Sequence, residues 1–252
     1  MEIGDFEKII EDKETEQIAS SILKEDIKQI SRICEQWGEN EDEVREYNVY
    51  IITTASKKAI LKKTEKIESD IYTKYLSKGD FNAPHLYGSL EKDGDNWICI
   101  EMIEGNDLRD MTDEIALSAA KTLSSIQEFF WTEELECTTE DEVKGRFIKY
   151  WQRVLRRAQF LADKPVLRKA YQIFLDRQLT APCTLSNGDF LEFNAMFDGE
   201  KVVMIDWGFG GMMPYSLDIA RFIAHATETR CTFPFYMNDS QKELFLNEVY
   251  AG

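Results

Sequence analysis

Three oxygen-bearing side chains lie close together in the second half of the sequence. Asp189 and Asn194 are separated by four residues, and Asp206 follows in an apolar-Asp-aromatic-Gly segment after a predicted β-hairpin. Phosphoryl transfer needs a carboxylate that orients and deprotonates the attacking hydroxyl, and oxygen ligands for the metal on the nucleotide phosphates. Asp189 suits the first role. Asn194 and Asp206 suit the second, because Mg²⁺ prefers one or two carboxylates together with phosphate oxygens.

A structural role is the alternative for each of these residues taken alone. Asp and Asn often hydrogen-bond the backbone of a turn, so one such residue carries no functional conclusion. The combined spacing, Asp-x-x-x-x-Asn followed by a hairpin and a second Asp, favours catalysis over turn formation.

The segment from Ser186 to Asn194, with Ile205-Asp206-Trp207-Gly208, resembles the catalytic loop of the aminoglycoside phosphotransferase and choline kinase superfamily, relatives of the protein kinases. Members carry His-Gly-Asp-x-x-x-x-Asn and then a hydrophobic-Asp-aromatic motif. The resemblance implies that Asp189 is the catalytic base and that Asn194 and Asp206 are the metal ligands. Asn187 replaces the usual His, and we expect its amide to organise the loop through hydrogen bonds to the backbone.

A kinase also needs a lysine on the third strand that contacts the nucleotide phosphates, and a glutamate on the next helix that holds it. Lys62 ends the apolar run Ala59-Ile60-Leu61, and Glu68 lies on the following predicted helix. Lys63 points to the opposite face of the strand. The pattern alone allows either Lys62 or Lys63 to contact the phosphates, and the family spacing selects Lys62. The alternative is that both are solvated surface lysines.

The resemblance implies further positions in the nucleotide site. Glu101 and Ile103 lie in the expected hinge, where main-chain groups would bind the base. The segment 37–43, with one glycine and four acidic residues, matches the phosphate-covering loop least well. Asp218 matches a family aspartate, and we expect it to cap the helix that begins there.

The elements that position these residues differ between the two parts of the chain. Residues 1–104 predict a small antiparallel-sheet lobe, and residues 105–252 predict a larger, mostly helical lobe. We therefore expect an α+β, protein-kinase-like two-lobed fold, with a nucleotide-binding lobe over 1–104 and a catalytic and acceptor-binding lobe over 105–252. Strands are expected over 27–36, 46–54, 57–63, within 82–103, and over 194–198 and 201–207. Helices are expected over 18–27, 65–79, 115–131, 145–161, 167–179, 217–227 and 240–250.

Composition narrows the function classes. The chain has 252 residues, and its 43% hydrophobic and 31% charged residues are typical of a globular enzyme. Its five cysteines are scattered and include no CxxC pair, which argues against a zinc site or a disulfide framework. A net charge of −17 argues against nucleic acid or an anionic membrane as partner. Without a signal peptide or an apolar span, we expect a cytoplasmic location.

The acceptor is the least determined part of the prediction. Similarity and negative charge favour a small cationic molecule, such as an aminoglycoside or amino alcohol, with ATP or GTP as donor and Mg²⁺ as cofactor. Candidate residues for binding its charge are Glu133, Glu134, Glu136 and residues near Asp239, although a solvated face explains them equally well.

Several alternatives stay open. A non-catalytic, nucleotide-binding pseudokinase would explain Asn187, but would not need all five of Lys62, Glu68, Asp189, Asn194 and Asp206. A protein kinase would need an activation segment ending in Ala-Pro-Glu, which does not follow Asp206. His85 and His225 are expected to be packing residues. The aromatic residues Tyr150, Trp151 and those of 233–236 could line a substrate cleft, but their spacing favours ordinary core. Because members commonly continue with further helices, we expect either a compact member or a C-terminal part that is missing or separate.

Overall fold

The structure is a computed structural model that describes residues 4–36, 43–133, 141–228 and 235–251. The chain divides into two compact units, the first comprising residues 1–79 and 83–104 and the second residues 80–82 and 105–252. An antiparallel sheet dominates the first unit and helices dominate the second. The predicted α+β class is therefore confirmed.

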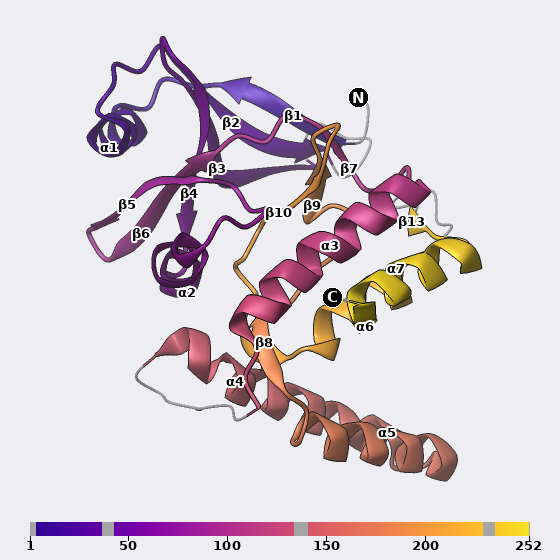
Figure 1. Cartoon of the computed structure of the whole chain (residues 1–252). Helices are drawn as coiled ribbons and strands as arrows, with labels where there is room; N and C mark the ends of the chain where they lie inside the picture. Colours follow the sequence, from indigo (N-terminus) through magenta and orange to yellow (C-terminus); the bar gives the residue numbers. More distant parts are fainter. Residues whose placement is uncertain (1–3, 37–42, 134–140, 229–234, 252) are drawn as a thin grey trace. The chain divides into compact units, whose positions relative to one another are not determined.

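The first unit is built on a six-stranded antiparallel sheet with the strand order β1-β2-β3-β4-β6-β5 (Figure 1). The predicted strands of this unit are confirmed, but β1 is an additional strand. It lies at the sheet edge, where Phe6 is 38% and Ile9 68% exposed, so its sequence lacks the alternation of a half-buried strand. The strands are β1 (Gly4–Ile9), β2 (Gln29–Gln36), β3 (Val44–Thr53), β4 (Lys58–Thr64), β5 (Leu86–Lys92) and β6 (Asp95–Glu101).

Helix α1 (Lys13–Leu23) packs against the sheet of the first unit. The helix begins earlier than predicted because Asp12 accepts hydrogen bonds from the N–H groups of Glu14 and Thr15 at 3.0 and 3.3 Å, which caps its first turn. It ends earlier because Lys24 adopts a left-handed conformation. Its Ile18 is buried in one core with Leu61, Trp97 and Cys99.

The predicted helix over 65–79 is present but irregular. It consists of α2 (Lys66–Asp70), a π-helical turn η1 (Ile71–Tyr75) and a 3₁₀ turn η2 (Leu76–Lys78). Helix α2 contacts β6, and Ile67 and Ile71 are fully buried. This segment therefore fixes the position of Glu68 by hydrophobic packing.

The second unit combines helices with short strands (Figure 1). All its predicted helices and its predicted hairpin are confirmed, with small shifts at their ends. The strands β8 and β11 were not predicted, because they are short, buried throughout and lack alternation. The helices are α3 (Asp113–Phe130), α4 (Glu142–Ala158), α5 (Pro165–Gln178), α6 (Ser216–His225) and α7 (Asp239–Ala251), with a 3₁₀ turn η3 (Gln159–Leu161) after α4. The strands are β7 (Asn106–Asp107), β8 (Cys183–Ser186), β9 (Ala195–Phe197), β10 (Val202–Met204), β11 (Gly211–Pro214), β12 (Thr227–Glu228) and β13 (Phe235–Tyr236).

An aromatic cluster around Phe222 of α6 forms part of the core of the second unit. The Phe222 ring stacks on Phe190 with a centroid distance of 4.6 Å and an interplanar angle of 11°. It also contacts Phe235 at 5.2 Å and Phe245 at 5.0 Å. Phe190 belongs to the segment that contains Asp189, so this core anchors the candidate catalytic loop, and the expectation that Phe235 is a packing residue is confirmed.

We expect Phe222→Ala to lower the free energy of unfolding by about 3–5 kcal/mol, because it leaves a cavity among three aromatic rings. Urea unfolding followed by circular dichroism measures this change. The matched control is Phe160→Ala, since Phe160 is 78% exposed, and its effect should stay within about 0.5 kcal/mol. Similar losses for both variants would contradict the central packing role of Phe222.

Candidate active site

Two strand pairs bring the candidate catalytic segments together in the second unit. Strand β8 pairs with β11, and β9 pairs with β10, both antiparallel. The loop of residues 187–194 connects β8 to β9, and Asp206 follows β10. A backbone hydrogen bond of 3.0 Å from the Ile205 N–H to the Asn194 carbonyl joins the two segments. The structure thus places Asp189, Asn194 and Asp206 on adjoining segments.

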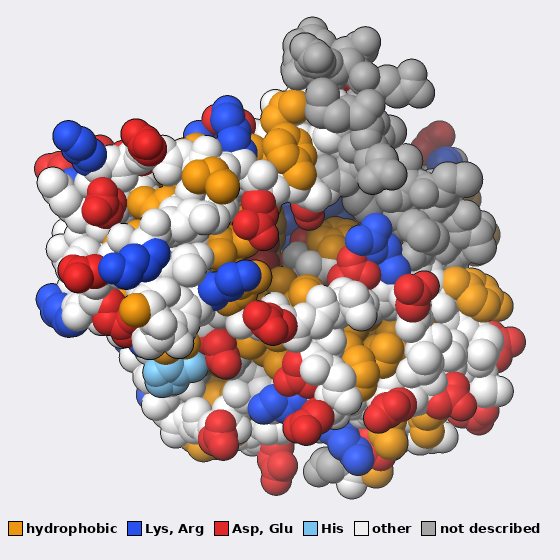
Figure 2. Space-filling model, turned by 90° about the horizontal axis from the view of Figure 1, so that it is seen from above, with side chains coloured by type: hydrophobic (Ala, Val, Ile, Leu, Met, Phe, Trp, Pro, Cys, Tyr) orange, Lys and Arg blue, Asp and Glu red, His pale blue; other side chains and the backbone are white. Residues whose placement is uncertain are grey.

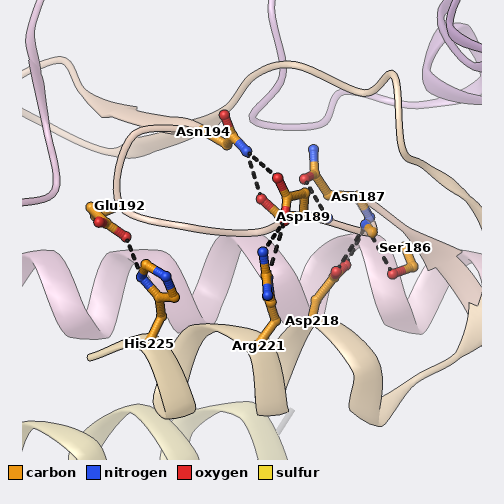
Figure 3. A network of polar contacts seen from close by, with 9 residues as sticks. Ser186, Asn187, Asp189, Glu192, Asn194, Asp218, Arg221 and His225 are labelled. Atoms are coloured by element: carbon orange, nitrogen blue, oxygen red, sulfur yellow. Dashed lines mark hydrogen bonds and ion pairs between the residues drawn. The ribbon is translucent and has the colours of Figure 1, made fainter. Parts of the chain in front are cut away.

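The carboxylate of Asp189 is held from two sides (Figure 3). The Nε and Nη2 atoms of Arg221 donate to its Oδ1 at 3.0 and 2.7 Å. The Asn194 Nδ2 donates to the Asp189 carbonyl at 2.7 Å and to Oδ2 at 3.3 Å. The Oδ1 of Asn194 points away from Asp189 (Figure 3), which leaves this oxygen turned toward other ligands.

Asn187 organises the loop as predicted. Its Nδ2 donates to the carbonyls of Ile205 and Asp206 at 3.0 and 3.2 Å. Its Oδ1 accepts the N–H of Asp189 at 3.3 Å. The side chain is fully buried, so these bonds form in a low-dielectric environment where each is strong. Asn therefore fixes the backbone at this position without the usual histidine.

Asp218 contacts the same loop from the side of α6 (Figure 3). Its side chain does not cap α6, so the prediction that it caps this helix is wrong. It is the third residue of α6, and its two carboxylate oxygens accept the N–H groups of Asn187 at 2.7 Å and Gly188 at 2.9 Å. Burial raises the pKa of Asp218 to about 6, and the Asp189 charge adds to this rise, while hydrogen bonds from Ser186 and the two backbone amides oppose it. The carboxylate thus orders the loop rather than the helix end.

Three polar side chains on one face of α6 contact the loop: Asp218, Arg221 and His225. Their spacing of three and four residues places them on the same side of the helix. His225 Nδ1 lies 3.2 Å from the Oε2 of Glu192, which is fully buried. His225 thus has a structural role, as expected, and adds a polar contact with Glu192 to it. The i, i+3, i+7 spacing of polar residues on an otherwise apolar helix was the available signal for Arg221 and His225.

The segment after Asp206 is fixed by close packing. Asp206 adopts a positive φ of 52°, a conformation that is uncommon outside glycine. Trp207 is fully buried, and its Nε1 donates to the Met204 carbonyl at 3.2 Å. Arg146 of α4 donates to the carbonyls of Gly208 and Phe209 at 3.3 and 3.2 Å. These contacts determine the backbone on both sides of Asp206.

In the first unit, Lys62 and Glu68 form the pair that the sequence suggests. The Lys62 Nζ lies 2.9 Å from each carboxylate oxygen of Glu68, whose side chain is 1% exposed. The Thr64 hydroxyl also donates to Glu68. Lys63 instead pairs with Asp95, and both of these side chains are partly exposed. The structure therefore distinguishes the two lysines that strand alternation left open.

The expected hinge lies at the end of β6. The Glu101 N–H donates to the His85 carbonyl at 2.8 Å. The Glu101 Oε2 accepts the His85 N–H at 3.2 Å. Residues 37–42 of the predicted phosphate-covering loop lie outside the described residues.

Asp189 also borders a cavity of about 900 Å³ within the second unit. Its walls come from α4, η3, α5, the 187–194 loop and α6. Among the described residues, neither Glu133 nor Asp239 lines it, and Glu134 and Glu136 lie outside the described part. Figure 2 shows acidic and basic side chains interspersed on the face drawn. The predicted acidic surface for a cationic acceptor therefore has no support beside Asp189.

The comparison with protein families agrees with this arrangement of residues. A model described as a phosphotransferase enzyme family matches residues 39–236, which is most of the chain. The chain belongs to the phosphotransferase enzyme family. This phosphotransferase is a small-molecule kinase, and no curated protein matched it in a separate sequence comparison.

Solved structures show that the phosphotransferase has the predicted kinase-like fold. An aminoglycoside-3'-phosphotransferase of type VIII is 18% identical over 87% of this chain and 86% of its own, with a TM-score of 0.55. A choline/ethanolamine kinase family protein from Mesorhizobium loti is 12% identical over 82% of this chain and 67% of its own, also with a TM-score of 0.55. An aminoglycoside phosphotransferase from Streptomyces rimosus, solved with ADP and streptomycin, is 15% identical over 79% and 88%, with a TM-score of 0.50.

The described part of the phosphotransferase meets neither the requirements of a metal cluster nor those of a membrane-spanning helix. The described residues contain no group of three or more His, Cys, Asp and Glu side chains placed to hold a metal ion. A metal ion bound here would therefore need some of its ligands from groups other than a cluster of these four side-chain types. Nor does the described part contain a helix with the length and apolar character that crossing a membrane requires.

Asp218→Asn tests the buried carboxylate through pH. The folded-state pKa of about 6 lies above the 3.8 of a free aspartate, so the folded state binds the proton more tightly. The protonated Asp218 side chain therefore stabilises the folded state. This stabilisation is fully present below about pH 4 and is lost as the pH rises through about 6.

We expect the wild type to lose stability relative to Asp218→Asn as the pH rises. Between pH 4 and 6.5, the difference between their free energies of unfolding should change by about 2–3 kcal/mol against the wild type. Urea unfolding across this range measures it, with the exposed Asp163→Asn as control. A difference that does not change with pH would contradict the raised pKa.

Proposed function

We propose that the enzyme transfers the γ-phosphoryl group of ATP or GTP to a hydroxyl of a small molecule, with Mg²⁺ as cofactor. The observation that carries this proposal is the placement of Asp189 at the edge of a large cavity, on a loop adjoining Asn194 and Asp206. The solved relative from Streptomyces rimosus, which binds ADP and streptomycin, supports a nucleotide donor and a small-molecule acceptor.

Asp189 is proposed as the base. The acceptor oxygen forms a bond to the γ-phosphorus, the bond from that phosphorus to the bridging oxygen of the departing nucleoside diphosphate breaks, and the hydroxyl proton passes to the Asp189 carboxylate. The cavity supplies a route by which an acceptor can reach this carboxylate. Arg221 holds Asp189 by Oδ1. Among the described residues, Oδ2 has a 3.3 Å contact with Asn194 and no ion pair, so Oδ2 is the oxygen proposed to receive the proton.

Asn194 and Asp206 are proposed as the magnesium ligands, and the donor set fits this ion. The Nδ2 of Asn194 is engaged by Asp189, which commits the other amide atom, Oδ1, to the role of ligand. One carboxylate and one carbonyl oxygen suit an ion that takes its remaining ligands from phosphates and water. When bound, the metal neutralises charge on the transferring phosphoryl group.

Lys62, Glu68, Glu101 and Ile103 are proposed to bind the nucleotide. The buried Glu68 holds the Lys62 ammonium, which favours contact with phosphate oxygens. Of the main-chain groups, the Glu101 carbonyl and the Ile103 N–H are proposed to bind the base. Because these contacts involve only backbone groups, they do not select between ATP and GTP. That selection would depend on the shape of the site around the base.

Asp189→Asn is expected to reduce phosphoryl transfer about 10²–10⁴-fold, because it removes the proton acceptor. The measurement is Mg²⁺-dependent nucleoside diphosphate release with a panel of aminoglycosides, amino alcohols, sugars and hydroxy acids. Asp163→Asn, at an exposed position on the same unit, is the matched control. Equal turnover by wild type and Asp189→Asn would refute the proposed base, and nucleotide binding without any turnover would favour the non-catalytic alternative.

Lys62→Met is expected to weaken nucleotide binding about 10- to 100-fold, the range for losing a hydrogen bond to a charged group. Titration of ADP with Mg²⁺ by calorimetry measures this directly and needs no acceptor. Lys63→Met is the control on the adjacent position of the same strand, and we expect unchanged affinity. An equal effect of both substitutions would show that general positive charge, and not the pair with Glu68, accounts for binding.

A further inference from the structure

The cavity beside Asp189 has a charge opposite to that of the chain as a whole. Asp189 is the only carboxylate among the described residues that line it, whereas Arg153, Arg157 and Arg221 all contribute to its walls. Residues 144–177, which include the lining parts of α4, η3 and α5 apart from Gln178, contain ten Lys and Arg and two Asp and Glu, compared with 30 and 47 in the whole chain. The acceptor cavity is thus locally basic within a strongly acidic protein.

Two of these arginines are available to a ligand. Arg153 and Arg157 lie four residues apart on α4, so their side chains share one face of the helix. In the described part of the chain, neither forms an ion pair with a carboxylate. Like charges at this spacing repel and weaken a helix, and an anion bound between them would remove this repulsion.

Tyr150 lines the cavity together with Arg153 and Arg157. Burial raises the pKa of Tyr150 to about 12, and the charges of Arg153 and Arg157 act in the opposite direction. Tyr150 is 6% exposed and its hydroxyl lies 3.2 Å from the Gln178 Oε1. Arg153 and Arg157 themselves line the cavity and are exposed to solvent, so an anion from solution reaches both guanidinium groups directly.

Most of the remaining wall is apolar or aromatic, and Gln178 and Ser216 are its polar side chains. It includes Val154, Phe160, Leu161, Tyr171, Phe174 and Leu217. A volume of about 900 Å³ lies within the range of pockets that bind small molecules with one or more rings. Flat apolar side chains of this kind stabilise a ring system by burial and offset stacking.

We infer that the acceptor is a hydroxylated molecule with an apolar ring body and an anionic carboxylate or phosphate group, and not a polycation. Arg153 and Arg157 bind the anionic group, the aromatic wall binds the ring, and together they direct the hydroxyl toward Asp189. The inference rests on the proposed phosphoryl transfer and names the class of its acceptor. It differs from the cationic acceptor that similarity and net charge together favoured.

A binding experiment tests the anion selectivity without catalysis. The probes are 8-anilinonaphthalene-1-sulfonate and N-phenyl-1-naphthylamine, which share a ring system but differ in one negative charge. In fluorescence titrations, we expect the double variant Arg153→Gln/Arg157→Gln to raise the Kd of the sulfonate about ten-fold or more and to leave that of the uncharged probe unchanged. Arg156→Gln, an exposed arginine between the two that does not line the cavity, is the control and should change neither.

Competition with the sulfonate probe identifies the anionic group. Benzoate and phenyl phosphate share a ring and differ in the group that the arginines would bind, so the stronger competitor identifies the preferred anion. Equal affinity of the wild type for both fluorescent probes, or a sulfonate Kd unaffected by the double substitution, would overturn the inference.

Phosphoryl transfer to three matched alcohols separates this inference from the proposed function. The compounds are 4-(2-hydroxyethyl)benzoate, its primary amide and 4-(2-hydroxyethyl)benzylamine, which share a hydroxyl and a ring but carry negative, no and positive charge. We expect kcat/KM to decrease in that order, and the double variant to raise KM for the benzoate with little change in kcat.

Preference for the amine would overturn the inference while leaving the transferase function intact. Transfer to none of the three, with arginine-dependent binding of the sulfonate probe, would uphold the anion-selective cavity and count against the proposed transfer.

Discussion

The buried carboxylate of Asp218 determines the geometry on which the candidate active site depends. Both of its oxygens accept backbone N–H groups, from Asn187 and Gly188, immediately before Asp189. Gly188 is required here because it has a φ of +79° and a Cβ would overlap the Phe209 carbonyl oxygen. A carboxylate that is desolvated must receive such bonds to stay charged, so the loop and the helix that carries Asp218 fix each other.

Helix α6 holds the loop with two different kinds of contact. Its apolar side stacks Phe222 on Phe190, which excludes water and anchors the loop in the core. Its polar side presents Asp218, Arg221 and His225 to successive parts of the loop. Hydrophobic burial supplies stability without direction, whereas hydrogen bonds and ion pairs supply direction. Together they hold the candidate base in one orientation before an acceptor arrives.

Charge is distributed unevenly, and the net charge of the chain is opposite in sign to the charge around the cavity. The value of −17 describes the mean field that governs solubility and long-range repulsion. Binding depends instead on groups within a few ångströms, because solvent and salt screen more distant charges. Around the cavity those groups are the arginines of α4 and α6. The basic stretch 144–177 is visible in the sequence, but only the fold shows that its Arg153 and Arg157 line the cavity that Asp189 borders.

The sequence by itself determined the fold class, most helices and strands, and the family, because periodicity and motif spacing are local properties. The sequence pattern left Lys62 and Lys63 open, and their contacts with Glu68 and Asp95 in the structure distinguish them. It did not determine β1, β8 or β11, whose short or exposed runs lack a period. Only the tertiary structure decided that Asp218 serves a loop some thirty residues away, that Arg221 holds Asp189, and that Arg153 and Arg157 line the cavity. The reason is physical: such contacts join residues distant along the chain, and their geometry is set by packing between elements, which no local pattern encodes.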